Sequence, residues 1–409
     1  MARTTLHKDF KMPKKRDDAA RENQRLNRFG LYSLILRDRL NLSRNSSNDF
    51  ETHIREAVNW LCRAQDGTPD DGFARAYNLA TGWEPSYPET TGYIIPTLLD
   101  YYHLTGKDEI LHRSIKAADW LLKLQFPEGG IPAGTVATEP KIPTIFNTGQ
   151  VIFGWVSAYK ESGNSLYLEA IRKACDWLVE TQDDDGAWRK YGSFVSTYAL
   201  NTYNTRTAWA VLQGGRLLDS DKYQISAVKN IEWALTQMND KGWFDNDCLI
   251  DNSKPLTHTI AYTIRGILEI GLAVKNERFI NSAIKSASMV LNTLHPNGFL
   301  PGRLDCNWTP KSNYNCLTGA CQMAIIWLRL YNLNKDMKFF NGAQRAIKYA
   351  CSTQDLKTSN MGVKGGIKGS FPINGEYGKF EYLNWAAKFF VDALLAYDII
   401  NHEHKECSN

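Results

Sequence analysis

Glycines recur at a nearly fixed period along this chain, and the repeat constrains the fold more than any single motif does. They stand at Gly72, Gly130, Gly186, Gly242, Gly298 and Gly366. The gaps between them are 58, 56, 56, 56 and 68 residues. A fixed period of this size is the signature of a repeat architecture, in which each unit is one supersecondary element. The sequence therefore predicts six copies of one unit.

Each unit contains two helical segments. The first ends shortly before the glycine: the copies run from Trp60 to Gln65, Trp120 to Gln125, Trp177 to Gln182, Trp233 to Gln237, Met289 to Leu294 and Tyr349 to Gln354. The second follows after a loop, and its first turn is polar. These second helices begin near Glu89, Asn147, Asn204, Thr257, Asn315 and Glu381. The pattern predicts twelve helices in six hairpins.

The length of the unit favours a closed ring over an open stack. A hairpin of about 56 residues is longer than the helix pairs of open solenoids, which have roughly 33 to 47 residues. Six long hairpins can close into a ring with one helix of each pair inside, so that no end repeat needs a polar cap. We therefore expect an all-α fold, an (α/α)6 toroid of six helical hairpins.

The extent of the repeat predicts the domain organisation. Residues 46–400 are expected to form a single toroid domain, since 409 residues with 43% hydrophobic side chains permit a large core. Residues 401–409 are expected to be a C-terminal tail. Residues 1–45 are expected to be a basic, partly disordered N-terminal arm. Its basic residues are Lys8, Lys11, Lys14, Lys15, Arg16, Arg21, Arg25 and Arg28.

Charge, apolar runs and cysteines exclude several classes of protein. A net charge of +4 from 48 basic and 44 acidic side chains is too balanced to indicate nucleic-acid binding. The longest apolar run near the N-terminus, 31–36, is too short for a signal peptide, and no membrane span is expected. The eight cysteines form no CxxC pair, so we expect reduced thiols in a cytoplasmic protein without a metal or other cofactor. The oligomeric state is left open.

The repeat motif also resembles those of known families. Trp-Leu-x-x-x-Gln followed by Asp-Gly-(Trp/Phe), at Trp177 to Trp188 and loosely at Trp60 to Phe73, resembles the repeat of the prenyltransferase and squalene-cyclase toroids. Six-hairpin glycosidases, toroid polysaccharide lyases and the helical domain of uronyl epimerases share this architecture. The cyclase proton-donor motif and the prenyltransferase zinc triad have no counterpart here. The resemblance therefore implies carbohydrate chemistry, by analogy of fold.

Polar side chains at the starts of the inner helices predict a pocket in the centre of the ring. Positions i, i+4 and i+7 share one face of a helix, which places His258, Tyr262 and Arg265 in one stripe. Buried polar groups left unsatisfied cost about 1 to 3 kcal/mol each, so a row of them indicates a wet lumen or mutual hydrogen bonds. The expected substrate-binding residues are Asn147, Gln150, Arg265, Asn315, Gln322 and Asn384, with the loop aromatics Trp83, Trp308 and Tyr377 stacking on sugar faces.

The side-chain types favour proton abstraction beside a uronate carboxylate, the step shared by β-eliminating lyases and uronyl C5-epimerases. This step needs a group that neutralises the carboxylate and a Tyr or His that moves the proton. We expect Arg206 and Asn204 to hold the carboxylate. His258 and Tyr262 are expected to act as base and acid. The substrate would be an acidic poly- or oligosaccharide.

Two alternatives remain open at this stage. A glycoside hydrolase needs paired carboxyl groups, and Glu89 and Glu381 open the first and last inner helices, which become neighbours when the ring closes. Both glutamates are also explained by the helix dipole, which favours acids at helix starts. The second alternative is a non-catalytic toroid that binds glycans in polysaccharide biosynthesis. The glycine-rich segment 354–380 is expected to be either a lid over the lumen or a long loop.

Overall fold

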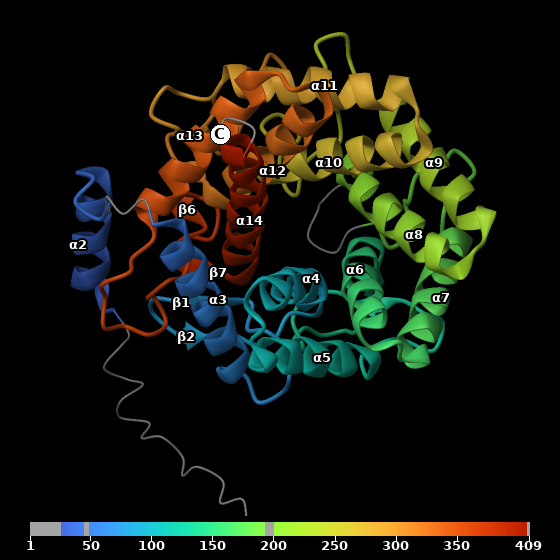
Figure 1. Cartoon of the computed structure of the whole chain (residues 1–409), viewed down its shortest axis with the longest axis horizontal. Helices are drawn as coiled ribbons and strands as arrows, with labels where there is room; N and C mark the ends of the chain where they lie inside the picture. The colour runs from blue at the N-terminus through green and yellow to red at the C-terminus, as the bar shows by residue number, and fades with distance from the viewer. Residues whose placement is uncertain (1–25, 45–48, 193–199, 407–409) are drawn as a thin grey trace, which may run out of the picture.

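The computed structural model describes residues 26–44, 49–192 and 200–406. Within these residues, six outer and six inner helices alternate around a ring, which confirms the predicted toroid (Figure 1). The outer helices are α3 (Phe50–Asp66), α5 (Asp108–Leu122), α7 (Ser165–Glu180), α9 (Asp221–Thr236), α11 (Glu277–Asn292) and α13 (Met337–Thr353). The inner helices are α4 (Pro88–Thr105), α6 (Ile145–Ser162), α8 (Thr205–Leu218), α10 (Thr257–Val274), α12 (Leu317–Asn334) and α14 (Asn384–Glu406).

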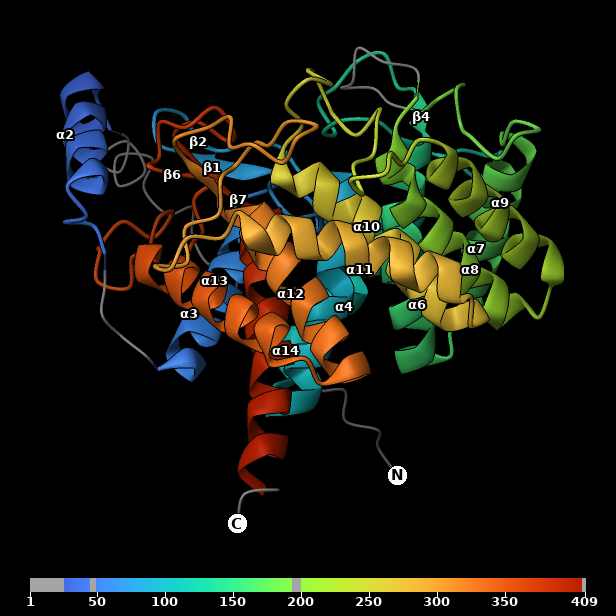
Figure 2. The ribbon, with the colours of Figure 1, turned by 90° about the horizontal axis from the view of Figure 1, so that it is seen from above.

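The two faces of the ring differ in their connections. Long loops lead from each outer helix to the next inner helix and carry short strands on one face, called here the rim face (Figure 2). The strands are β1 (Ala76–Asn78), β2 (Gly82–Trp83), β3 (Ile131–Pro132), β4 (Pro143–Thr144), β5 (Asn315–Cys316), β6 (Ser370–Phe371) and β7 (Glu381–Leu383). They form the sheets β2-β1-β7, β3-β4 and β5-β6. The inner helices α4, α6, α8, α10 and α12 end at the opposite face, called the back face, in short turns whose first residue has a positive φ.

The first and last hairpins meet through both helices and strands. Helix α14 packs against α3 and α4, and β1 pairs with β7 so that Tyr77 lies opposite Tyr382. The side chain of Gln354, at the end of α13, donates from Nε2 to the carbonyl of His53 in α3 at 3.2 Å. The ring is therefore closed by the same kinds of contact that join its other hairpins.

The glutamine that ends the outer helices ties each unit to the next. Gln125 Nε2 donates to the carbonyls of Gly129 and Ala170 at 3.0 and 2.9 Å. Gln182 repeats this with the carbonyls of Gly186 and Ser226 at 2.9 and 3.1 Å. One amide thus fixes its own glycine turn and the following outer helix. This contact explains why the glutamine recurs in the sequence.

The periodic glycine is required by close approach as well as by backbone conformation. Gly186 has φ +95°, and a Cβ there would lie 2.3 Å from the carbonyl oxygen of Lys229 in the next outer helix. In the second and sixth units the glycine with positive φ is Gly129 or Gly365, one position before the glycine that keeps the period. The turn therefore docks directly on the neighbouring outer helix.

Aromatic side chains fill the space between the two helical layers. Trp155 and Trp327 on inner helices are fully buried, and each indole nitrogen donates to a carbonyl of an outer helix. Trp188 and Trp243, which follow the periodic glycine, are buried in the wall.

Among the described helices, none is long and apolar enough to cross a membrane.

The described part of the N-terminal segment packs on the outside of the ring as helix α2 (Arg28–Arg39) (Figure 1). Its Asp38 is 1% exposed, forms an ion pair with Lys368 at 2.7 Å and accepts from the backbone N–H of Ile373. The basic residues expected in the arm before position 26 lie outside the described residues. At the other end, α14 continues to Glu406, past residue 400 where the sequence places the end of the toroid.

Candidate active site

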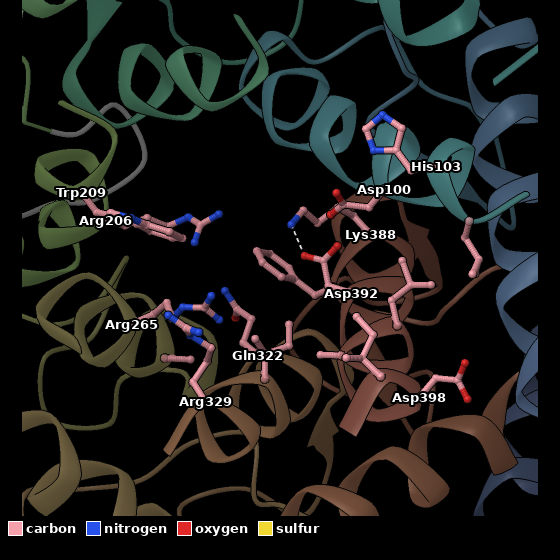
Figure 3. Close-up of a pocket in the computed structure, with 17 residues that line it drawn as sticks. Asp100, His103, Arg206, Trp209, Arg265, Gln322, Arg329, Lys388, Asp392 and Asp398 are labelled. Atoms are coloured by element: carbon pink, nitrogen blue, oxygen red, sulfur yellow. Dashed lines mark hydrogen bonds and ion pairs between the residues drawn. The ribbon is translucent and has the colours of Figure 1, made fainter. Parts of the chain in front are cut away.

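The lumen has a large cavity toward each face. The rim cavity has a volume of about 390 Å³, and its lining includes Tyr87, Glu89, Asn147, His258, Tyr262 and Tyr377. The back cavity has a volume of about 460 Å³, and its lining includes Asp100, Arg206, Arg265, Gln322, Lys388 and Asp392 (Figure 3). The residues predicted from the sequence are therefore divided between two sites.

Glu89 lies in the first turn of α4, directly after Pro88 at the helix start. Its carboxylate accepts a hydrogen bond of 2.5 Å from the hydroxyl of Tyr87. Burial raises the pKa of Glu89 to about 7, against the lowering effects of the Tyr87 hydrogen bond and the Arg206 charge. A carboxyl group with this pKa can hold or release a proton near neutral pH.

His258 lies in the first turn of α10 and is held in one tautomer. Its Nδ1 is 2.7 Å from Oε1 of Gln322 in α12, and an amide oxygen only accepts, so Nδ1 carries the proton. Burial lowers the pKa of His258 to about 4, and the nearby charge of Arg206 acts in the same direction. The ring is therefore neutral at pH 7, with an Nε2 lone pair available as a base.

A layer of aromatic side chains separates the two cavities. Tyr262 packs against His258 in a tilted arrangement with ring centroids 4.5 Å apart, and its ring centroid lies 5.0 Å from that of Phe146 and 6.0 Å from that of Phe389. Tyr93 contacts Phe389 at 5.5 Å and lines cavities on both sides of the layer. Burial raises the pKa of the Tyr262 hydroxyl above its usual range. The rim cavity thus has an aromatic floor.

Arg206 lies behind this floor and does not line the rim cavity. Its Nε donates to Oε1 of Gln150 at 2.7 Å. The guanidinium carbon is 5.0 to 5.7 Å from the ring centroids of Tyr93, Phe153, Trp209, Tyr262 and Phe389. Burial lowers the pKa of Arg206. Its charge nevertheless acts on Glu89, His258 and Tyr262 across the floor.

Glu381 lies outside the lining of the rim cavity, in strand β7 rather than at a helix start. Its carboxylate is 2.7 Å from a guanidinium nitrogen of Arg75, which also pairs with Glu84. Arg75 itself lines the rim cavity and lies 5.8 Å from the Trp385 ring. Among the described lining residues, Glu89 is the one carboxyl group.

The first-turn asparagines mainly hold the rim loops. The amide nitrogens donate to loop carbonyls: Asn147 to Pro132 at 2.9 Å, Asn384 to Ala74 at 2.9 Å and Asn204 to Gly192 at 3.4 Å. Of these three, Asn147 also lines the rim cavity. Asn315 is fully buried in β5 and lines neither lumen cavity. Their recurrence in the sequence therefore reflects hairpin geometry as well as the site.

Of the three loop aromatics predicted to stack on sugar faces, one lines the rim cavity and two pack elsewhere. Tyr377, from the glycine-rich segment, lines the rim cavity 5.3 Å from His258, and its hydroxyl accepts from the Trp385 indole at 2.7 Å. Trp83 packs against Trp60 and Tyr77. Trp308 is buried against Trp243, and its indole nitrogen donates to the carbonyl of Lys241. The glycine-rich segment thus contributes a wall of the cavity.

Among the lining residues that the sequence analysis did not single out are Arg75, Tyr93 and Trp385. Tyr87 and Tyr93 flank Glu89 along the chain, so the i+4 spacing from Glu89 to Tyr93 was a usable signal. Arg75 comes from the loop before α4, where no periodicity marks it.

Among the residues that the structure describes, no cluster of three or more His, Cys, Asp and Glu side chains is arranged to hold a metal ion.

One family model matches part of the chain. The family model for pectic acid lyase matches residues 144–229, which is less than half of the chain. No curated protein matches the sequence.

Solved structures resemble almost the whole chain. An unsaturated glucuronyl hydrolase specific for heparin has a TM-score of 0.70 at 17% identity, covering 87% of this chain and 99% of its own. The unsaturated glucuronyl hydrolase of Bacillus sp. GL1 has a TM-score of 0.67 at 13% identity, covering 85% and 96%. The cellobiose 2-epimerase of Bacillus thermoamylovorans has a TM-score of 0.64 at 12% identity, covering 85% and 98%. The fold is therefore that of the six-hairpin toroid glycosidases and epimerases.

Proposed function

We propose that this protein is a carbohydrate-active enzyme that moves a proton on an acidic saccharide bound in the rim cavity. The observation that carries the proposal is the pairing of Glu89 and His258 in one cavity of about 390 Å³. Near neutral pH the histidine is unprotonated and the carboxyl group is close to its pKa, of about 7. Such a pair supplies a base and an acid at the same pH.

In this mechanism Nε2 of His258 removes the proton beside the carboxylate of a uronate sugar. Glu89, hydrogen-bonded to Tyr87, delivers a proton to the departing oxygen in a lyase or back to carbon in a C5-epimerase. The negative charge that develops on the substrate is stabilised by the positive charge of Arg206 behind the aromatic floor. Charge interactions of this kind are strong where water is excluded.

The acidic nature of the substrate is supported from two directions. The positive field of Arg206 reaches Glu89, His258 and Tyr262, so the cavity favours an anionic ligand. Structural neighbours include hydrolases of unsaturated glucuronyl sugars, and the matching family model is that of pectic acid lyase. Tyr377 and Trp385 offer ring surfaces to a sugar.

We also propose that the enzyme acts in the cytoplasm.

A glycoside hydrolase is the second candidate, favoured by the raised pKa of Glu89 and by the glucuronyl hydrolase neighbours. It would use Glu89 as a single acid, because Glu381 is bound to Arg75 outside the described lining. A toroid that binds glycans without turnover is the third candidate. The three candidate functions are distinguished by the products they form, because a binding protein forms none.

The test is incubation with uronate-containing oligosaccharides, both saturated and unsaturated. A lyase generates the absorbance of an unsaturated uronate, a hydrolase releases reducing ends or removes that absorbance, and an epimerase incorporates deuterium from heavy water at C5. His258→Ala and Glu89→Gln are each expected to lower turnover about 100- to 10,000-fold. His295→Ala, an exposed histidine in an outer loop, is the matched control and should keep full activity. Unchanged turnover in both cavity variants would contradict the proposal.

A further inference from the structure

One wall of the back cavity carries three guanidinium groups, and a single carboxylate, that of Glu269, pairs with two of them. Arg265 Nε lies 2.6 Å from Oε1 of Glu269, and Arg329 makes two hydrogen bonds of 3.0 Å to the same carboxylate. Arg206 is 5% exposed and pairs with no carboxylate among the described residues; its one hydrogen bond is to Gln150. This wall therefore carries excess positive charge.

Gln322 adds a further donor to this wall. Its Oε1 is engaged by His258 on the rim side, while the residue also lines the back cavity. Figure 3 shows its amide nitrogen directed toward the guanidinium of Arg265, on the same side as Arg206. Donor groups from α8, α10 and α12 thus converge with no acceptor between them among the described side chains.

The labelled carboxylates of the cavity lie on the wall opposite the guanidinium groups (Figure 3). Asp392 pairs with Lys388 and accepts a hydrogen bond of 2.6 Å from Thr97. Asp100 lies beside this pair on α4, across the open space from Arg206 and Arg265 (Figure 3). Among the described residues, no ion pair joins Asp100 or Asp392 to Arg206 or Arg265.

We propose that the back cavity is a second ligand site, in which the oxyanion of a small organic molecule binds between Arg206, Arg265 and Gln322. A buried cation without a partner is unfavourable, and a bound oxyanion supplies that partner. Guanidinium groups match carboxylates, phosphates and sulfates through paired N–H donors. The cavity is larger than such a group, and Trp209 and Ile399 also line it, so the rest of the ligand contacts apolar surface.

A bound oxyanion has a consequence for the rim cavity, and this step rests on the proposed function. When the anion accepts from Nε2 of Gln322, the amide is held with Oε1 toward Nδ1 of His258. That orientation keeps the proton on Nδ1 and leaves Nε2 as the base. Occupancy of the back cavity therefore favours the active tautomer of His258.

Binding is tested without any turnover assay, so its failure is distinct from failure of the proposed function. Inorganic phosphate, sulfate and glucuronate are titrated into the full chain by calorimetry at low ionic strength. Arg206→Met and Arg265→Met should each weaken binding of inorganic phosphate about 10- to 100-fold. Arg216→Met removes the same charge from the other end of α8, where the side chain donates to the carbonyl of Ala273, and should leave affinity unchanged.

A second measurement covers the case in which Arg206→Met does not fold. Crystals of the unmodified protein soaked in selenate should show an anomalous peak between Arg206 and Arg265. Preference for phosphate and sulfate over glucuronate identifies a phosphorylated or sulfated ligand, and the reverse identifies a carboxylate. The proposal is overturned if none of the three anions binds, if Arg216→Met loses as much affinity as the cavity variants, or if selenate occupies only other positions.

Discussion

Two ionisable side chains of the rim cavity have pKa values displaced toward each other, and this sets the pH range of activity. Burial lowers the pKa of His258 to about 4 and raises that of Glu89 to about 7. The base is active only when deprotonated, above pH 4, and the acid only when protonated, below pH 7. We therefore expect kcat/KM to rise with pH through about 4 and to fall through about 7.

Glu89→Gln identifies the group responsible for the alkaline limb. The amide does not titrate, so the remaining activity of this variant should no longer fall through pH 7. The measurement is the pH profile of kcat/KM for wild type and variant. An alkaline limb that persists near pH 7 in Glu89→Gln would assign that limb to another group.

Gln322 is a positioning residue, and two substitutions should move the acid limb in opposite directions. Gln322→Met removes the acceptor for Nδ1–H, which lowers the pKa of His258 further and reduces kcat about 10-fold or more with little change in KM. Gln322→Glu keeps an acceptor and adds negative charge, which raises that pKa. A shift in the same direction for both variants would show that Gln322 has a merely structural role.

At the level of residues, the sequence predicted which types of side chain line the rim cavity better than it predicted how far along the lumen each side chain lies. Glu89, His258, Tyr262 and Tyr377 share the cavity, as polar helix starts and rim loops suggested. Arg265 follows His258 by seven residues, which is about 10 Å along a helix, so the two fall on opposite sides of the aromatic floor. The position of that floor depends on packing between helices, which spacing along one helix does not specify.

At the level of elements, the turn that ends each outer helix is the most constrained. Gly163 and Gly186 both have positive φ, but a Cβ at Gly163 meets nothing within 4 Å, whereas at Gly186 it meets the Lys229 carbonyl at 2.3 Å. Gly163→Ala should cost about 1 kcal/mol of unfolding free energy, from backbone strain alone. Gly186→Ala should cost about 3 kcal/mol or more, because overpacking is added to that strain.

Chemical denaturation of the two glycine variants measures this difference directly. Equal losses would show that φ alone selects the periodic glycine, and that docking on the next outer helix is unimportant.

The sequence predicted the helices well and the strands not at all. The helices have strong apolar periodicity, and their ends are marked by glutamine and glycine. The strands contain two or three residues each, too few for an alternating pattern to be recognised. Asn315 and Glu381 were assigned to helix starts because their helices follow at once, at Leu317 and Asn384. A helix boundary shifted by two or three residues is enough to turn such a side chain away from the lumen.

At the level of the whole molecule, closure makes every hairpin dependent on two neighbours. Deleting residues 384–409 removes α14, which packs against α3, α4, α12 and α13. We expect the truncated chain to lose cooperative thermal unfolding altogether, because the opening exposes buried surface on both sides of the gap. An open solenoid would lose only its end unit and one interface.

Calorimetry of two truncated chains distinguishes these outcomes. Removal of residues 401–409 alone, which leaves α14 in contact with its neighbours, is the control and should keep one sharp transition. A sharp transition near the original temperature after deletion of 384–409 would mean that the five remaining hairpins are stable without closure.

Closure also means that the order of the hairpins along the chain is not imposed by the fold. Each inner helix packs against the outer helix that follows it, and α14 packs in the same way against α3, although no peptide segment joins them there. The exposed turn at Gly163, between α6 and α7, is one of several equivalent junctions. A circular permutant that begins at Asn164, with α14 linked to α3, should therefore assemble the same ring. The break between α14 and α3 is one choice among six.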